Sequence, residues 1–460
     1  MIARIHTRAH FSPLLLLAVA SAAVAPIQAV GQSCLVGTAA DEFTADAAGL
    51  TREWILQLPY VASGYSLDQV VVGDGLVVAQ TSDGTVHAVQ AAPWGEDSPA
   101  AGAPRPGSLL WSQRVGTGGG PIARAGIGPD LVVVPHERGI TGLERPTGHL
   151  RWQEPFSQIV SGGATVSGNW AYVPSSPGTV NRFAVNPLRH SAETTTADDK
   201  RAAAPTGKKA AKKTKAKRQR KESLVPIAIH AGGNNHVEIA PIQLTTGVLW
   251  CTSDGLLVTL QPSELDWRRL EFSLENPPAG SPVVRDRSIF SATTAGDLAR
   301  VDLPVSNKKE LQLTWHTVLP GPAFSGPFLS GDTVVVSLGD LGIAAYSAET
   351  GVERWQTCLT GKILAVGGGR VWLIDELGKL SAFDLADGAP RERLCLGPFT
   401  LPVVNIHSDR LLLASSSGML VSLAPRTTGT PTPAEAADPA ATAPVAPARG
   451  TSGPASTPRP

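Results

Sequence analysis

The chain has 460 residues and carries 39 lysines and arginines against 39 aspartates and glutamates, so its formal net charge is zero. Its 47 glycines and 38 prolines, with few long segments of helical periodicity, exclude a helical bundle and favour an all-β protein. After the N-terminal segment no stretch approaches the roughly 18 consecutive apolar residues of a membrane-spanning helix, so we expect no transmembrane span there.

Residues 1–29 have the pattern of a secretory signal peptide. Two arginines precede an apolar stretch at residues 11–25, and small residues lead to a cleavage position after Ala29. We therefore expect a periplasmic or secreted protein. Cys34 is the candidate lipid anchor, but the residue three positions before it is not apolar as a bacterial lipobox requires, so we expect no lipid there.

A β-hairpin pattern recurs about eight times along the chain. In the first copy, Val77–Val89, an apolar run leads through the turn Asp83-Gly84 into a second alternating run. Glycine supplies the positive φ that a tight hairpin turn needs, and β-branched residues suit half-buried strands. The other copies centre on Gly139, Gly178, Gly255, Gly296, Gly342, Gly378 and Gly418. Each copy predicts two antiparallel strands.

A short segment with tryptophan follows most hairpins and predicts the outermost strand of a repeating unit. The interpretation places Trp111, Trp152, Trp267, Trp315 and Trp355 at equivalent positions, with Arg393 and the strand of Ile227 and Ile229 as substitutes. The step from Trp315 to Trp355 is about 40 residues, the length of one four-stranded propeller blade. Innermost strands are predicted at 120–123, 281–284 and 401–404, where a small residue or proline precedes an apolar run.

The two ends of the repeat complete one another. The last hairpin ends near Leu423 without an outer strand, whereas the segment from Arg52 to Leu58 contains Trp54 and has no hairpin before it. Pairing the two gives an eighth blade and removes both open sheet edges. The sequence thus predicts an eight-bladed β-propeller of four-stranded antiparallel blades over residues 52–424, its ring closed by an N-terminal outer strand.

Three segments differ in composition from this propeller. Residues 191–222 are a predicted disordered basic insert in the third blade, and residues 425–460 are a predicted disordered Pro/Ala/Thr-rich tail. The run Lys208 to Lys221 is either an arm for polyanions or a solvated loop without a partner. Because no aromatics interrupt it, it does not predict specific nucleic-acid recognition. A shorter Pro/Ala/Gly loop at 91–107 marks a blade face, where propellers place partner-binding loops.

The repeat resembles a known family. The strand Gly378 to Asp384 and the Gly-x-x-x-Trp element Gly351 to Trp355 are similar to the PQQ-like repeat of quinoprotein dehydrogenases and of BamB-type lipoproteins of outer-membrane assembly. The resemblance covers roughly residues 52–424 and implies a propeller. It also implies that the repeated glycines and tryptophans dock neighbouring blades, so we interpret the tryptophans as core residues.

The resemblance to quinoprotein dehydrogenases further implies an adjacent cysteine pair, a calcium ion held by carboxylates and amides, and an aspartate base. The chain has no adjacent cysteine pair. Its candidate aspartates fall in turns, where the carboxylate bonds local backbone amides, and they are Asp74, Asp83, Asp254, Asp332 and Asp340.

The histidines give no clear ligand set either. His230, His236 and Glu238, with the turn residues Asn234 and Asn235, form no convincing cluster, and His136, His149 and His316 occupy places that do not match one another. We therefore predict no catalytic, cofactor-binding or metal-binding residue and expect no cofactor.

Four cysteines in an exported chain suggest disulfides, but the predicted fold separates two of them. Cys358 and Cys395 fall on outer strands of adjacent blades, beyond the Cα separation of roughly 7 Å that a disulfide tolerates. Cys251, beside Trp250, is predicted to be a small buried hydrophobe.

These patterns predict an exported, non-enzymatic propeller that acts as a rigid platform for a protein partner in the cell envelope. Two alternatives stay open. One is a quinone- or metal-dependent enzyme with a degenerate site in the central channel. The other is an envelope protein that binds polyanions or polysaccharide through Lys208 to Lys221.

Overall fold

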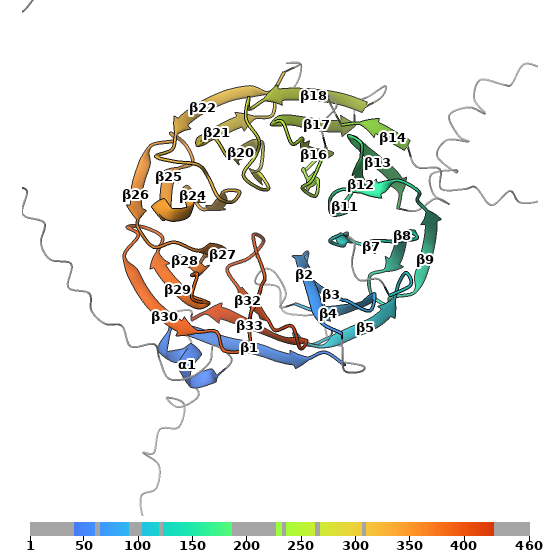
Figure 1. The fold of residues 1–460 in the computed structure, drawn as a ribbon, viewed down its shortest axis with the longest axis horizontal. Coiled ribbons are helices and arrows are strands. Elements are labelled where there is room, and N and C mark those ends of the chain that lie inside the picture. Colours follow the sequence, from blue (N-terminus) through green and yellow to red (C-terminus); the bar gives the residue numbers. More distant parts are fainter. Residues whose placement is uncertain are drawn as a thin grey trace, which may run out of the picture. The chain divides into compact units, whose positions relative to one another are not determined.

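The structure, a computed structural model, describes residues 41–59, 65–91, 104–118, 123–185, 227–231, 236–262, 267–305 and 310–426. All of them belong to one compact unit, Leu35–Pro460. In it, eight antiparallel sheets follow one another around a ring, as Figure 1 shows. The prediction of an all-β, eight-bladed propeller is confirmed.

In blades 1 to 7 the strands follow chain order from the channel to the rim, whereas in blade 8 the outermost strand is the first strand of the chain. The first four blades contain β2 (Leu67–Gly73), β3 (Leu76–Thr81), β4 (Thr85–Gln90) and β5 (Leu109–Arg114); β6 (Gly126–Ile127), β7 (Leu131–His136), β8 (Gly139–Glu144) and β9 (Leu150–Pro155); β10 (Ile159–Val160), β11 (Thr165–Ser167), β12 (Trp170–Ser176), β13 (Thr179–Ala184) and β14 (Ile227–His230); and β15 (Ile242–Gln243), β16 (Val248–Cys251), β17 (Leu256–Pro262) and β18 (Trp267–Ser273). In blade 3 the innermost strand is split, because both β10 and β11 pair with β12.

The remaining four blades complete the ring. They contain β19 (Val283–Arg285), β20 (Ser288–Ala292), β21 (Asp297–Asp302) and β22 (Gln312–Val318); β23 (Phe328–Ser330), β24 (Thr333–Ser337), β25 (Ile343–Ser347) and β26 (Glu353–Thr357); β27 (Lys362–Gly367), β28 (Arg370–Ile374), β29 (Lys379–Asp384) and β30 (Pro390–Cys395); and β31 (Leu401–Pro402), β32 (Leu411–Ala414), β33 (Met419–Pro425) and β1 (Leu50–Gln57). A helix, α1 (Glu42–Ala47), precedes β1, and a short 3-10 helix, Gly339–Leu341, joins β24 to β25.

The alternation of strand direction gives the ring two distinct faces. Turns between the second and third strands of all blades lie on one face, together with the links to the next blade; we call this the hairpin face. Turns between the third and fourth strands lie on the other face, which we call the insert face. The residues that flank the predicted insertions, Ala91 and Pro104 in blade 1 and Val185 and Ile227 in blade 3, lie on the insert face.

The core lies between blades. One cluster joins Val78 and Trp111 of blade 1 to Val132 and Leu143 of blade 2, and equivalent clusters follow around the ring. Burial of these apolar faces is the main term that stabilises the ring, at about 25 cal/mol per Å². A blade taken alone would expose both of its faces.

The tryptophans dock each blade to the next, as the resemblance implies. Trp111 Nε1 donates a hydrogen bond to the carbonyl of Arg145 in blade 2 at 2.7 Å. The indole lies directly over Gly148, where an added Cβ would be 2.6 Å from Trp111 Cδ2. Trp355 repeats this arrangement with the carbonyl of Leu385 and with Gly388. Only glycine permits this approach, so the glycine and the tryptophan form one joint.

One predicted equivalence needs correction. Trp267 begins β18 and pairs with Pro262, whereas the equivalent position, opposite Thr259, belongs to the buried Leu270. The spacing of residues in the sequence could not reveal this shift, because a tryptophan at either of the two positions is equally typical of a strand. Arg393 does take the tryptophan position, opposite Ser381, but it binds Asp375 of its own blade.

Arg370 makes the contact from blade 7 to blade 8 instead. Its guanidinium donates a hydrogen bond to the carbonyl of Ala48 at 2.6 Å, and a Cβ at Gly49 would lie 3.0 Å from its Nη2. An arginine from a different strand therefore occupies the place that an indole takes in the neighbouring blades.

Ring closure follows the prediction. β1 pairs with β33 from Leu50 opposite Pro425 to Gln57 opposite Met419. Glu53 on β1 accepts hydrogen bonds from Arg410 Nε and Ser422 Oγ, both at 2.9 Å. Trp54 is buried in a cluster with residues of blade 1, so the same strand completes blade 8 and joins the ring.

Helix α1 was not predicted. Asp41 caps it by accepting hydrogen bonds from the Thr44 backbone amide and hydroxyl. Ala45 and Ala48 pack into the cluster that joins blades 7 and 8. The helix therefore covers the closing junction.

The innermost strand predicted at 120–123 in blade 2 lies outside the described residues except for Ala123, which is not in a strand. The described innermost strand of this blade is β6, Gly126–Ile127. The buried Gln80 side chain donates to the Ala123 carbonyl and accepts from the Ala125 amide at 2.9 Å. This side chain occupies the backbone groups that a longer strand would use. The strands β19 and β31 overlap their predictions.

The cysteines agree with the prediction in part. Cys251 is buried and free, and burial raises the pKa of its thiol to about 12. Cys358 is exposed and free, so it is not joined to Cys395. Cys395 is nevertheless disulfide-bonded, to a partner outside the described residues, and the blade geometry did not predict this bond.

The predicted signal peptide 1–29 and basic insert 191–222 lie outside the described residues, as does the predicted tail 425–460 apart from Pro425 and Arg426.

Closure through β1 yields a first prediction. Trp54→Ala should lower the free energy of unfolding by about 3–5 kcal/mol, because it opens a cavity in the cluster that seals the ring. Ile55→Thr, a change at an exposed position of the same strand, should alter it by less than about 0.5 kcal/mol. Urea unfolding of both variants measures the two values. Equal values would show that β1 does not carry the closure.

Candidate functional site

The candidate aspartates act in turns and in ion pairs. Asp83 accepts hydrogen bonds from the Thr85 amide and hydroxyl at 3.0 and 2.9 Å. Burial raises the pKa of the Asp83 carboxyl, but these bonds and one from Thr81 lower it further, so the pKa lies below its ordinary value. Asp254 accepts from the Thr252 hydroxyl in the same turn of blade 4. Asp74 and Asp332 pair with arginines. Only Asp340, in the 3-10 helix, has no hydrogen bond or ion pair to another described residue.

The candidate histidines do not converge. His136 lies in blade 2, His316 pairs with Asp297 in blade 5 at 2.9 Å, and His236 Nδ1 lies 3.2 Å from Ser176 Oγ. Across the part of the chain that the structure describes, no group of three His, Cys, Asp or Glu side chains could hold a metal ion. Asn234 and Asn235 lie outside that part.

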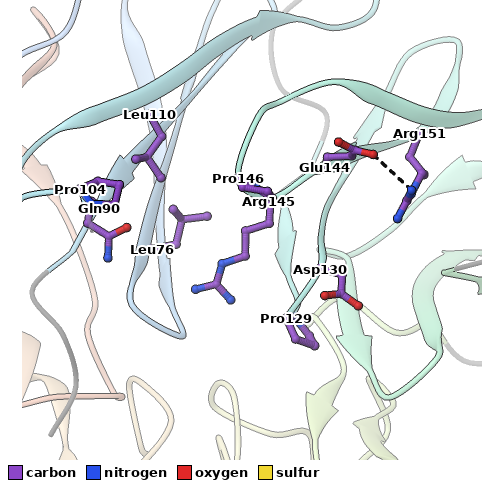
Figure 2. A pocket seen from close by; sticks show the side chains of 10 residues that line it. All are labelled: Leu76, Gln90, Pro104, Leu110, Pro129, Asp130, Glu144, Arg145, Pro146 and Arg151. Carbon is purple, nitrogen blue, oxygen red and sulfur yellow. Dashed lines mark ion pairs between the residues drawn. The ribbon is translucent and has the colours of Figure 1, made fainter. Parts of the chain in front are cut away.

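A cavity of about 640 Å³ opens on the insert face between blades 1 and 2. Figure 2 shows the side chains around it. Its lining combines leucines and prolines with a few charged groups, and consists of Leu76, Gln90, Pro104, Leu110, Pro129, Asp130, Glu144, Arg145, Pro146 and Arg151. Sequence reasoning missed this cavity, although its rim includes Pro104, at the end of the loop singled out at 91–107.

Arg145 lies across the middle of this cavity and is fully engaged. Its guanidinium binds the carboxylate and the carbonyl of Asp74 in blade 1, and it donates to the Gly128 carbonyl at 3.2 Å. Arg151 pairs with Glu144 at 3.2 Å (Figure 2). Arg145 therefore joins blade 2 to blade 1, whereas the pair of Arg151 and Glu144 lies within blade 2.

No histidine, cysteine, serine or threonine is among the described lining residues of the cavity. Of its charged groups, Glu144 pairs with Arg151, and Arg145 pairs with Asp74, which lies outside the lining. The arrangement can hold a side chain or small molecule of mixed polarity.

No helix within the described ranges is long and apolar enough to cross a membrane.

Two buried histidines predict a pH dependence of the propeller's stability. His87 Nδ1 lies 2.7 Å from Ser112 Oγ, and His136 Nε2 lies 2.8 Å from Thr141 Oγ1. The Arg138 amide donates to His136 Nδ1, so the neutral ring holds its proton on Nε2. Burial lowers the pKa of both histidines below the ordinary value of 6.5.

Because the unfolded chain binds these protons first, the free energy of unfolding should fall as the pH drops from about 6.5 toward the lowered pKa values. The double variant His87→Asn/His136→Asn should lose part of this dependence. Urea midpoints at pH 7.0 and 5.5, compared between wild type and variant, measure the difference. An identical shift in both proteins would contradict the assignment.

Comparison with solved structures supports the fold. The crystal structure of BamB from Moraxella catarrhalis matches with a TM-score of 0.56 and 16% identity, over 83% of this chain and 99% of that chain. The computationally designed Ika8 protein matches with a TM-score of 0.53 and 12% identity, over 80% of this chain and 98% of that chain. At such identities the likeness shows the fold alone. No curated protein matches the chain.

A family comparison carries the assignment further. The model of the family described as outer membrane protein assembly factor BamB matches residues 100–191 and 253–398, which together make up more than half of the chain. The matched segments contain the docking tryptophans of blades 1, 2, 5 and 6 and the glycines beneath three of them. This protein therefore belongs to the family described as outer membrane protein assembly factor BamB.

Proposed function

We propose that this protein is an exported, periplasmic β-propeller scaffold that holds protein partners together during outer membrane protein assembly. Membership of the BamB family is the observation that carries the proposal. The ring supplies a rigid frame, because blade-to-blade joints and the β1 strand fix every blade against its neighbours.

The chemistry of the described residues supports binding over catalysis. Four of the five candidate aspartates serve turns or ion pairs, and the cavity between blades 1 and 2 is lined by apolar residues and by charged groups of which Arg145, Glu144 and Arg151 are paired. A scaffold needs a fixed shape and exposed contact residues, both of which a closed propeller provides.

Co-purification from cells tests the scaffold function. A tagged copy of the full chain, isolated from envelope extracts after mild crosslinking, should recover proteins of outer membrane assembly, and deletion of the gene should lower the amounts of outer membrane proteins. Recovery of none of them, together with an unchanged outer membrane profile after deletion, would defeat the proposal.

The residues do not fit a quinone cofactor. The family resemblance to quinoprotein dehydrogenases implies an adjacent cysteine pair and a calcium site; the cysteines at 34, 251, 358 and 395 are not adjacent, and the described residues contain no group of metal-ligating side chains. Within the described residues, the degenerate-enzyme alternative therefore lacks the ligands that the resemblance implies.

Incubation of the full-length protein with pyrroloquinoline quinone and calcium should give neither retained quinone absorbance after dialysis nor alcohol oxidation. A calcium-dependent quinoprotein dehydrogenase treated in parallel is the positive control. Stoichiometric retention of the quinone would favour the enzyme alternative over the scaffold.

Polyanion binding by Lys208 to Lys221 stays a prediction, because this run lies outside the described residues.

A further inference from the structure

Two adjacent blades share a turn sequence that the other six lack. In those six the residue before the hairpin glycine varies, and it is Asp83, Arg138, Pro177, Asp254, Ala295 or Ser417. In blades 6 and 7 this residue is Leu341 or Leu377, and each leucine directly follows an acid, Asp340 or Glu376. We call these two pairs the acid–leucine turns.

The leucines are not part of the core. Leu341 is 44% and Leu377 is 75% exposed, in a ring whose strands bury most of their large apolar side chains. Burying a leucine side chain stabilises a fold by about 1.5–3 kcal/mol, and much of this stabilisation is lost when the side chain stays exposed, as at these two positions. The fold alone therefore does not explain leucine at either turn.

The acids in these turns are also unused by the fold. In blade 7 the turn is held by Asp375, which accepts hydrogen bonds from the Leu377 and Lys379 amides at 3.0 and 2.8 Å. Glu376 makes no hydrogen bond or ion pair to another described residue, and the same holds for Asp340. Both carboxylates are free to meet a partner.

Further apolar side chains extend the surface at the junction of blades 5 and 6. Val318, at the end of β22, is 73% exposed, and Phe324, in the link to blade 6, is 71% exposed. The link lies against the blade 6 turn, since a Cβ at Gly321 would be 2.5 Å from Leu341 Cδ1 and the Phe324 amide donates to the Ser337 carbonyl at 2.8 Å.

These four side chains share one side of the ring. Strand β22 ends on the hairpin face, and the turns of blades 6 and 7 lie on the same face; Figure 1 shows β22, β24 and β28 in consecutive blades. We call Val318, Phe324, Leu341 and Leu377 the leucine surface. Exposed apolar side chains on adjacent blades of one face offer a surface for protein contact.

We propose that the leucine surface, with the carboxylates of Asp340 and Glu376, binds a segment of a partner protein in which apolar side chains lie next to lysine or arginine. The proposal rests on the scaffold function and names the surface that this function uses. Leu341, Leu377 and Phe324 contact the partner's apolar side chains, and the two carboxylates receive its cations.

The charges around the surface decide what each part contributes. Lys362 and Lys379 lie in the flanking strands of blade 7, so the net charge of the region is small. Apolar contact therefore supplies most of the affinity, and the carboxylates set the orientation and register of the segment. The acids also oppose an anionic lipid surface, which makes a membrane the less suitable occupant.

Cys358 offers a direct readout of occupancy. It is an exposed free thiol, and a Cβ at position 342, directly after Leu341, would lie 2.9 Å from Cys358 Cα. Cys251 is buried and free, so in the folded protein a maleimide should modify Cys358 selectively. The rate of this modification, followed by intact-protein mass spectrometry, reports whether a ligand covers the surface.

The probes are three synthetic peptides of equal length, with alternating Leu and Lys, Leu and Glu, or Ser and Lys. The Leu–Lys peptide should slow modification of Cys358 by about fivefold or more at saturation, and Leu341→Ser/Leu377→Ser should weaken its apparent affinity by about tenfold or more. Asp340→Asn/Glu376→Gln should weaken it about threefold. Val352→Ser, at a 64% exposed position on the insert face of blade 6, is the matched control and should change nothing.

Several results would overturn the proposal. Equal protection by the Ser–Lys peptide would mean that apolar contact is not required, and unchanged protection in the leucine double variant would place binding elsewhere. Protection by phosphatidylcholine vesicles but not by the Leu–Lys peptide would assign the surface to lipid.

A parallel co-purification separates this proposal from the scaffold function. If the wild-type protein recovers assembly proteins and Leu341→Ser/Leu377→Ser recovers them equally well, the surface is wrong and the function stands. If the wild-type protein recovers none, the function itself fails, whatever the peptides do.

Discussion

The propeller depends on the joint between one blade and the next. At four junctions an indole N–H donates to a carbonyl of the following blade, and at three of these the ring lies over a glycine that leaves no space for a side chain. The hydrogen bond fixes direction, and the apolar cluster around it supplies most of the free energy. Each blade has apolar residues on both of its faces. A single missing joint would therefore expose two apolar blade faces, one on each side of the gap.

The joint between blades 7 and 8 differs from the four indole joints in its donor. Between blades 7 and 8 the donor is the guanidinium of Arg370, which reaches the Ala48 carbonyl past Gly49. The donor, carbonyl and glycine are retained although the indole is not. Helix α1 and the β1 strand then cover this junction, so the segment before the first complete blade holds the ring shut.

Most of the fold could be predicted from the sequence because its signals are local. Glycines at hairpin turns, such as Gly84 and Gly378, and the orphan strand with Trp54 were enough to give the number of blades and the closure. Features that sequence reasoning missed depend on contacts between distant residues. Gln80 bonds the backbone directly before β6, and the docking role of Arg370 is visible only when Ala48 lies beside it.

The candidate surfaces were harder to predict for the same reason. The cavity brings Leu76 together with Arg151, two residues that share no motif. The acid–leucine turns were recognised as hairpins, but a leucine before a turn glycine gives no sign in the sequence of whether it is buried or exposed. The exposure of such a side chain depends on its contacts with the neighbouring blade. A local sequence pattern does not describe those contacts.

A rigid ring that binds through one face leaves a specific signature in hydrogen exchange. In the complex purified from envelopes, slowed exchange should be confined to segments 319–327, 338–342 and 375–378 on the hairpin face, while the buried strands of all blades exchange as in the free protein. Slowed exchange at 128–130 and 145–151 on the insert face, or altered exchange throughout the strands of several blades, would contradict the account of a fixed scaffold that presents the leucine surface.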